Sequence, residues 1–315
     1  MALPALMVEE ILLRVPPDEP AHLIRAAVVC KAWRRILFDS GFRCRYCTFH
    51  RTRPLLGYIH NFGFRAGLEF VPTTTFFPPS LAASRNSYRA LDCRHGLLID
   101  TSGPPGFIVW DPITGDRQHL SFLAHAQENL CCYTGAVLCA VDGCDHLDCH
   151  GGPFLVVFVG GTEGAHPIDV DHVRYTWASV YLSETGEWSA QTSGTNKQHY
   201  YNIAVREPSL LIGGALYFTL GAMRILKYDL SRHGLSVIEI PRLFHKSVPI
   251  DIDGGLGFVD KYIYTWSQQD GIGGWMLHNV AELQTLIPQH RGSPYRDHPS
   301  DVIRFVEGTN TILFT

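Results

Sequence analysis

The amino-acid sequence predicts a mixed, multidomain chain: a small all-α domain of three helices followed by an all-β domain of the propeller type. Three observations predict this fold class. Apolar residues recur at helical spacing over roughly the first forty positions. From about residue 55, short β-rich runs alternate with Gly, Pro, Asp, Asn and Ser. Within that second part, one hairpin pattern recurs three times.

Length and composition agree with two folded domains. The chain has 315 residues, of which 46% are hydrophobic and 18% are charged, so it can bury a sizeable core. No apolar run approaches the roughly 18 residues that span a bilayer, and Glu9 and Glu10 interrupt the stretch that a signal peptide would need. We therefore expect neither membrane insertion nor secretion.

Cysteine usage points to a reducing compartment. The nine cysteines are an odd number, are spread irregularly and accompany no export signal. This pattern favours reduced thiols over a disulfide framework. We therefore expect the protein in the cytoplasm, the nucleus or both.

The first helix is predicted by an apolar stripe. Val8, Ile11, Leu12 and Val15 recur at i, i+3, i+4 and i+7, which places them on one face. The pair Pro16-Pro17 ends this helix.

Two further helices follow. Asp18 can cap the second helix with Pro20 in its first turn, and its apolar spacing is repeated by Leu23, Ala26, Ala27 and Cys30. After a bend near Cys30, the third helix has the apolar residues Trp33, Ile36 and Leu37, with Lys31, Arg34 and Arg35 between them. A domain this small cannot bury so much apolar surface by itself, so the sequence predicts a partner.

The N-terminal stretch resembles the F-box family. The resemblance rests on Leu3-Pro4-Ala5-Leu6, Glu10-Ile11-Leu12 and Val29-Cys30-Lys31-Ala32-Trp33-Arg34-Arg35. It implies a helical trio that docks on a Skp-type adaptor and, through it, on cullin and RING subunits. The positions implied to bind the adaptor, which mix adaptor contacts with the domain's own core, are Leu3, Pro4, Leu6, Ile11, Leu12, Leu23, Val29, Cys30 and Trp33. The alternative is a helical cap that only packs on the following domain.

The second part is predicted to contain short strands and repeated hairpins. Clear strands lie at 107–110, 136–139, 154–158, 216–218 and 262–266. The repeated hairpin occupies 109–117, 180–188 and 227–234, and each copy has a polar turn ending in Gly, where a left-handed backbone is favourable. The copies are separated by about 70 and about 47 residues, which brackets a propeller blade once an insertion or an extra blade is allowed. A further blade is predicted at 256–276.

Along nearly its whole length the chain resembles plant, grass-type F-box proteins with a C-terminal F-box-associated β-propeller-like domain. The residues that carry this resemblance are 90–96, 110–112 and 142–149. The resemblance implies an F-box domain at 1–45, a linker at 46–60 and a β-propeller-like substrate-recognition domain at 61–315. The strand pattern at 311–315 has no turn after it, so we expect a propeller that is incomplete at its C-terminal end.

One cluster has metal-ligating residue types: Cys144, His146, Cys149 and His150. A structural zinc site usually draws ligand pairs from two separated elements, whereas this cluster is a single tight loop. The pattern therefore favours free thiols and capping Asp residues over zinc, and we predict no metal and no cofactor.

No catalytic motif stands out. The chain has no Gly-x-Ser-x-Gly elbow, no His-Glu-x-x-His and no phosphate-binding Gly-x-x-x-x-Gly-Lys. The basic cluster Arg43, Arg45, Arg51 and Arg53 has no accompanying nucleic-acid recognition motif, so a solvated basic face is the better interpretation.

These observations favour a non-catalytic substrate-receptor subunit of a Skp-cullin-F-box ubiquitin ligase. The helical domain would bind the adaptor, and the β domain would bind a target protein that the sequence does not identify. The alternative is a stand-alone β-propeller module for a peptide or glycan with a non-functional F-box.

Overall fold

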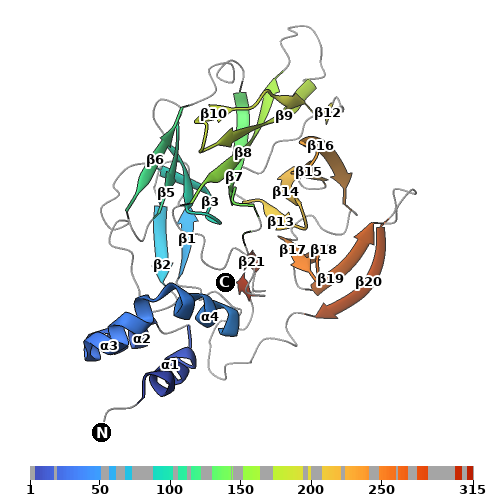
Figure 1. Ribbon diagram of the computed structural model, residues 1–315. Coiled ribbons are helices and arrows are strands. Elements are labelled where there is room, and N and C mark those ends of the chain that lie inside the picture. The colour runs from blue at the N-terminus through green and yellow to red at the C-terminus, as the bar shows by residue number, and fades with distance from the viewer. Residues whose placement is uncertain are drawn as a thin grey trace. The chain divides into compact units, whose positions relative to one another are not determined.

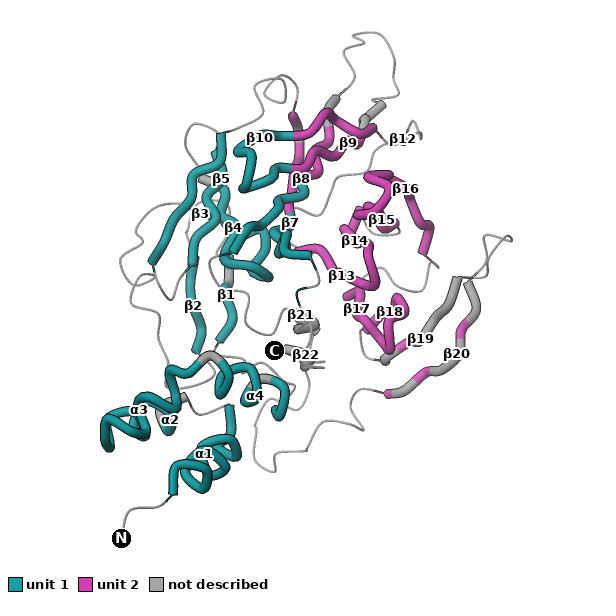
Figure 2. The backbone as a smooth tube through the Cα atoms, viewed as in Figure 1, with its two compact units in different colours: residues 1–123, 136–157, 181–188 teal, residues 124–135, 158–180, 189–315 magenta. Residues whose placement is uncertain are grey.

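A computed structural model describes the helices, most of the predicted strands and several turns (Figure 1). The described residues are 4–17, 20–50, 57–61, 68–72, 88–101, 106–111, 115–121, 130–142, 144, 152–163, 173–193, 198–199, 208–220, 224–240, 248–259, 262–268, 275–282, 302–306 and 311–314. The chain divides into two compact units (Figure 2). Unit 1 comprises residues 1–123, 136–157 and 181–188, and unit 2 comprises 124–135, 158–180 and 189–315.

Four helices form the N-terminal part of unit 1. They are α1 (Ala5–Leu13), α2 (Pro20–Val29), α3 (Lys31–Phe38) and α4 (Ser40–His50). The first three lie where the apolar spacing predicts them, with Cys30 at the bend between α2 and α3, where its Sγ accepts a hydrogen bond from the amide of Trp33. None of the helices in the described ranges is long and apolar enough to cross a membrane.

The fourth helix is a departure from the predicted trio. Asp39 caps it, because its carboxylate accepts a hydrogen bond of 2.9 Å from the amide of Phe42. Phe42 is 2% exposed, so burial of its ring adds to the cap. Helix α4 extends to His50 and the first strand begins at Gly57, so both lie partly inside the stretch predicted as a linker at 46–60.

The helical part has its own apolar core. Side chains from three helices meet in it: Val8 and Leu12 of α1, Ala26 of α2 and Phe42 of α4. Trp33 of α3 packs against this cluster while remaining partly exposed. Through this core, α1 packs together with α2 and α4.

Unit 1 also contains antiparallel strands. A two-stranded sheet pairs β1 (Gly57–Asn61) with β2 (Leu68–Pro72). A four-stranded sheet has the order β3-β4-β5-β6, formed by β3 (Tyr88–Asp92), β4 (Leu97–Thr101), β5 (Phe107–Trp110) and β6 (Arg117–Leu120). Leu97, Ile99, Ile108 and Trp110 form its buried cluster, and Ile59 of β1 packs against them.

A larger antiparallel sheet has the order β10-β9-β8-β7. Its strands are β7 (Leu130–Cys139), β8 (Phe154–Glu163), β9 (Val173–Leu182) and β10 (Glu187–Trp188). Two short strands, β11 (Thr192–Ser193) and β12 (Gln198–His199), also pair with β9. The predicted strands at 136–139 and 154–158 are therefore confirmed.

Besides strands of the larger sheet, the described residues of unit 2 form two four-stranded antiparallel sheets and a terminal pair. The first sheet runs β13 (Leu210–Ile212), β14 (Ala215–Leu220), β15 (Arg224–Asp229) and β16 (Gly234–Glu239). The second runs β17 (Val248–Ile252), β18 (Gly255–Val259), β19 (Tyr262–Gln268) and β20 (Trp275–Glu282). The terminal pair is β21 (Val302–Val306) with β22 (Thr311–Phe314).

The first strands of these successive sheets lie next to one another. Within unit 2, β13 contacts β17 and β17 contacts β21. Neighbouring first strands and sequential four-stranded antiparallel sheets are the construction of propeller blades. The all-β, propeller-like prediction is confirmed to this extent, whereas closure of a ring stays a prediction.

The turn chemistry of the repeated hairpin is confirmed at two copies and wrong at the third. Gly115 and Gly186 have φ values of 86° and 71°, as a left-handed turn glycine requires. In the third copy the left-handed residue is His233, with φ 51°, and not Gly234. The ring Nδ1 of His233 lies 2.8 Å from the hydroxyl of Tyr228. Histidine is one of the residues that adopt a positive φ more often than most others.

Residues 90–96, one of the motifs that carry the family resemblance, include the buried acidic residue Asp92. One carboxylate oxygen of Asp92 accepts a hydrogen bond of 2.7 Å from Arg94, and the other accepts one of 2.8 Å from the amide of Val137 in β7. Asp92 is 6% exposed, so the Arg94 guanidinium and the Val137 amide together satisfy a buried charge. This carboxylate therefore joins β3 to β7.

Candidate interaction surface

The candidate site lies on the helical part, and it begins with the two faces of α1. Val8 and Leu12 point into the core and are 3% and 1% exposed. Met7 and Ile11, also four residues apart, are 55% and 50% exposed on the other side. Helix α1 therefore presents large apolar side chains to solvent as well as to the core.

Helix α2 has the same property more strongly. Ala26 is buried, whereas Ile24 and Val28 are 62% and 79% exposed. A helix that is apolar on opposite faces is normally buried on both of them. The outward face of α2 is therefore the face that a partner would cover.

The remaining helices add further exposed apolar residues. We call the whole group the exposed apolar set, and its members are Leu6, Met7, Ile11, Ile24, Val28, Val29, Phe38 and Phe49. All four helices contribute to it. Scattered single apolar residues need no explanation, but so many on a small helical domain indicate an interaction surface.

The structure divides the predicted adaptor-binding residues into two groups. Leu6, Ile11 and Val29 belong to the exposed apolar set, and Pro4 and Cys30 are also exposed.

The second group faces inward. Leu12 is in the core, Trp33 packs against that core, and Leu23 is half-buried. Leu3 lies outside the described residues. These placements suggest which positions are available to a partner, while adaptor contact at each of them stays a prediction.

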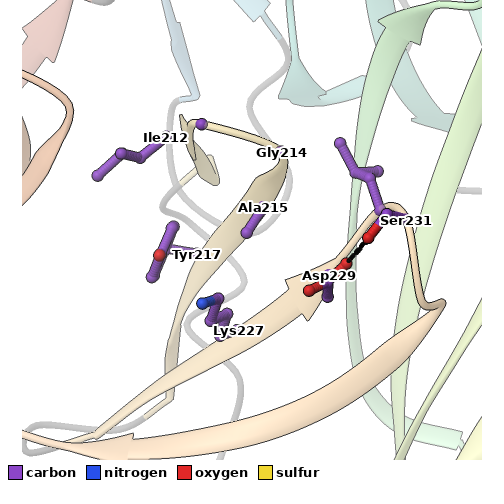
Figure 3. Close-up of a pocket in the computed structure, with 9 residues that line it drawn as sticks. Ile212, Gly214, Ala215, Tyr217, Lys227, Asp229 and Ser231 are labelled. Carbon is purple, nitrogen blue, oxygen red and sulfur yellow. Dashed lines mark hydrogen bonds between the residues drawn. The ribbon is translucent and has the colours of Figure 1, made fainter. Parts of the chain in front are cut away.

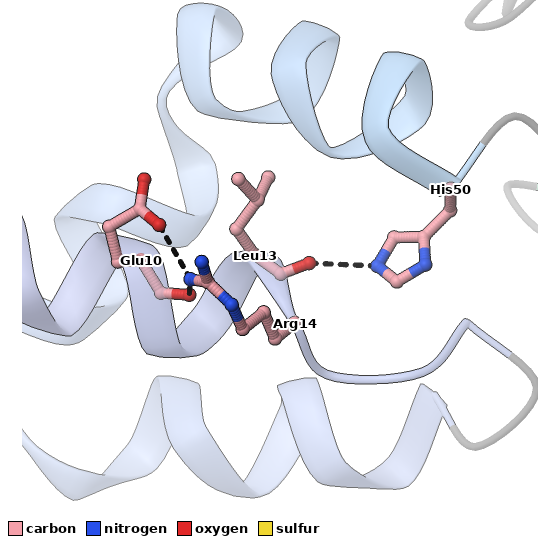
Figure 4. Close-up of polar contacts among 4 residues, drawn as sticks. All are labelled: Glu10, Leu13, Arg14 and His50. Carbon is pink, nitrogen blue, oxygen red and sulfur yellow. Dashed lines mark hydrogen bonds and ion pairs between the residues drawn. The ribbon is translucent and has the colours of Figure 1, made fainter.

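Helix α4 holds the end of α1 in place. The Tyr46 hydroxyl donates a hydrogen bond of 2.5 Å to the carbonyl of Val15. Figure 4 shows the second contact, in which Nε2 of His50 lies 2.8 Å from the carbonyl of Leu13. Carbonyls at a helix C-terminus have no partner within the helix, so these side chains satisfy acceptors that would otherwise need water. The rings of Tyr46 and His50 also contact each other in a tilted arrangement, with centroids 4.4 Å apart.

Sequence reasoning missed α4 and its contacts. The available sequence feature was the spacing of Phe42, Tyr46 and His50, which recur every four residues after a capping Asp39. The surrounding arginines and cysteines hid that pattern. The contacts with α1, more than thirty residues earlier in the chain, have no counterpart in local sequence.

Two ion pairs lie on helices that carry members of the exposed apolar set. Glu10 and Arg14 form an ion pair one turn apart on α1, and both side chains are 61% exposed (Figure 4). Arg45 of α4 pairs with Glu9 of α1. Exposed pairs of this kind contribute little to stability, so their main effect is on the charge pattern that a partner meets.

Most of the cluster with metal-ligating residue types lies outside the described residues. Of its four members only Cys144 is described, and His146, Cys149 and His150 lie outside the described residues. Within the described ranges no group of His, Cys, Asp and Glu residues could hold a metal ion. The preference for free thiols over zinc at this loop stays a prediction.

The N-terminal residues therefore form a helical domain with exposed apolar side chains, and antiparallel β-sheets follow it along the chain. Residues 1–45 match the family model of the F-box domain, so the chain carries an F-box domain at its N-terminus. No curated protein matches the chain.

Among solved structures, the crystal structure of BamB from Moraxella catarrhalis is 12% identical to this chain. The match covers 72% of this chain and 85% of that one, with a TM-score of 0.27. At that TM-score the likeness carries no argument about the fold or the function.

Proposed function

We propose that this chain is the substrate-receptor subunit of a ubiquitin ligase of the Skp-cullin-F-box type. The observation that carries the proposal is the F-box domain at residues 1–45 together with its exposed apolar set. The F-box domain binds a Skp-type adaptor, and the adaptor joins it to cullin and RING subunits. The β-rich domain binds the target protein.

The proposed mechanism is proximity. The chain supplies no acid, base or nucleophile to ubiquitin transfer, and it holds the lysines of a target near the charged ubiquitin carrier. Tethering raises the effective concentration of the two reactants and so accelerates the transfer. The residues that matter for this role are interface residues.

The proposed compartment is the cytoplasm, the nucleus or both. Cys30 and Cys44 are exposed cysteines that form no disulfide within the described residues, which suits a reducing environment. Microscopy of a fluorescent fusion would test this assignment, and retention in the secretory pathway would contradict it.

The adaptor contact is tested by binding of the intact chain to a purified Skp-type adaptor. The test variant replaces two exposed apolar residues of α1, Leu6→Asp with Ile11→Asp, which are 76% and 50% exposed. Both side chains lie outside the core, so the helical domain should still fold. We expect binding to weaken about 100-fold or more, because two charges would be buried in an apolar interface.

A matched control is Val141→Asp, which changes a 42% exposed apolar residue outside the helices. It should bind the adaptor like the intact chain. Trp33 is unsuitable as a test position because it packs against the helical core. Adaptor binding that survives the double substitution, or no binding by the folded intact chain, would contradict the proposal. The second result would favour a stand-alone recognition module.

A further inference from the structure

We propose that unit 2 contains a recognition pocket for a peptide side chain that ends in an oxyanion, either a carboxylate or a phosphate. This inference names a substrate feature and in that respect rests on the proposed receptor function. The pocket is a cavity of about 550 Å³ lined by the ends of two hairpins of one sheet (Figure 3). One wall is the β13–β14 turn, and the other is the end of β15 with the turn that follows.

The basic group of this pocket is Lys227. It lies opposite Tyr217 in the β14–β15 pairing, and its Nζ is 5.7 Å from the centre of the Tyr217 ring. Among the described residues, this ammonium has no hydrogen-bond or ion-pair partner. The Tyr217 hydroxyl likewise has no hydrogen-bond partner there. Two adjacent donors therefore line the cavity without an acceptor.

Asp229 lies in the same cavity but its carboxylate is engaged by its own turn. One oxygen accepts hydrogen bonds of 2.7 Å from the Ser231 hydroxyl, 2.9 Å from the Ser231 amide and 3.0 Å from the Arg232 amide. Asp229 therefore stabilises the turn and forms no ion pair with Lys227 among the described residues. The positive charge of Arg232 partly offsets the negative charge of Asp229.

The ionisation of Asp229 supports this division of roles. The hydrogen bond from the Ser231 hydroxyl lowers the pKa of Asp229, and the Arg232 amide and guanidinium lower it further. The carboxylate is therefore charged at neutral pH and keeps its turn bonds. The ammonium of Lys227, which forms no ion pair among the described residues, is the group that would contact the oxyanion of a ligand.

The walls of the pocket are fixed before a ligand arrives. The Leu230 amide donates a hydrogen bond of 3.0 Å to the carbonyl of Gly214, which ties one hairpin end to the other. Tyr228, next to Lys227 on the opposite face of β15, is 1% exposed and anchors the strand in the core. A preformed pocket reduces the ordering cost of binding.

The test measures calorimetric binding of three capped hexapeptides to the full chain: hexaglutamate, hexaglutamine, and a peptide with two phosphoserines among glycines. The variants are Lys227→Gln, Lys227→Arg, and Lys31→Gln as a matched exposed-lysine control outside the pocket. We expect an anionic peptide to bind and hexaglutamine not to bind. Lys227→Gln should weaken binding about tenfold or more, while Lys227→Arg and Lys31→Gln retain it.

The two anionic peptides distinguish the carboxylate from the phosphate as the preferred group. The proposal is overturned if neither peptide binds the folded chain, or if Lys227→Gln binds as tightly as the intact protein. The measurement needs no adaptor, so loss of the adaptor contact and loss of the pocket are separate results. Peptide binding without adaptor binding would remove the ligase assignment and leave the pocket.

Discussion

The hydroxyl of Tyr46 donates a hydrogen bond of 2.5 Å to the carbonyl of Val15. This bond attaches helix α4 to the residues that directly follow α1. The two residues are 31 positions apart. Val15 comes just after α1, where backbone carbonyls lack helical partners. The position of α1, and with it the direction of Leu6 and Ile11, therefore depends on a helix outside the predicted trio.

Replacing Tyr46 tests this dependence. We expect Tyr46→Phe to lower the free energy of unfolding of the helical domain by about 1 kcal/mol, because the Val15 carbonyl loses its donor while the ring still packs. Adaptor binding should weaken in parallel, although Tyr46 is not a proposed contact. Urea denaturation with an adaptor-binding measurement checks both effects. Thr48→Ala, at an exposed position on the same helix, is the control, and equal effects of the two changes would contradict the role of Tyr46.

Adjacent residues of α1 should differ in what they do. Leu12 is 1% exposed and Ile11 is 50% exposed, so Leu12→Ala should destabilise the helical domain by about 2–5 kcal/mol and Ile11→Ala should change stability little. The adaptor affinity should fall for Ile11→Ala at temperatures where both variants are folded. Thermal unfolding and calorimetric binding measure the two properties. A large loss of stability from Ile11→Ala would show that its outward placement is wrong.

The buried carboxylate of Asp92 should contribute strongly to the stability of unit 1, because it joins β3 to β7. Asp92→Ala would remove the carboxylate that accepts hydrogen bonds from the Arg94 guanidinium, whose side chain is 15% exposed, and from the Val137 amide. Breaking a buried pair in this way costs about 3–5 kcal/mol. Denaturant unfolding followed by tryptophan fluorescence would measure the loss. Asp116→Ala, at an exposed turn position, provides a comparison, and an Asp92→Ala variant as stable as that one would contradict the prediction.

The free energy of unfolding of unit 2 should decrease at alkaline pH, because the phenol of Tyr228 ionises there. Burial of the ring raises the pKa of Tyr228 to about 12, and the charge of Asp229 adds to the shift. The folded state therefore keeps the phenol proton between pH 10 and about 12, where the unfolded state loses it. This contribution is complete below pH 10 and is lost as the pH rises toward 12.

A Tyr228→Phe variant isolates that contribution. It should be less stable than the intact chain at pH 8, because the hydrogen bond with His233 is lost. Above pH 10 the difference should shrink, since the variant has no phenol to ionise at this position. Unfolding curves from pH 8 to pH 12 measure this trend. A constant difference across the range would show that Tyr228 does not titrate with a raised pKa.

Local sequence patterns were sufficient for the elements with strong periodicity or turn chemistry. The apolar spacing of Val8, Ile11 and Leu12 predicted α1, and the turns at Gly115 and Gly186 have the backbone that their glycines suggested. At His233 the same reasoning failed, because Gly234 already pairs with Asp229 in the ladder, so the last residue of the turn, and the one with positive φ, is His233. The register of the pairing decides which residue ends the turn, and a local hairpin pattern does not show that register.

The candidate surface shows the same limit. The sequence by itself determined that the N-terminal residues form apolar helices of F-box type and that antiparallel strands follow. It could not separate Leu12 from Ile11, because both are large apolar residues on a helix. Only the tertiary structure decided which of them is covered, because burial depends on the neighbours that Phe42, Ala26 and the rest of the core provide.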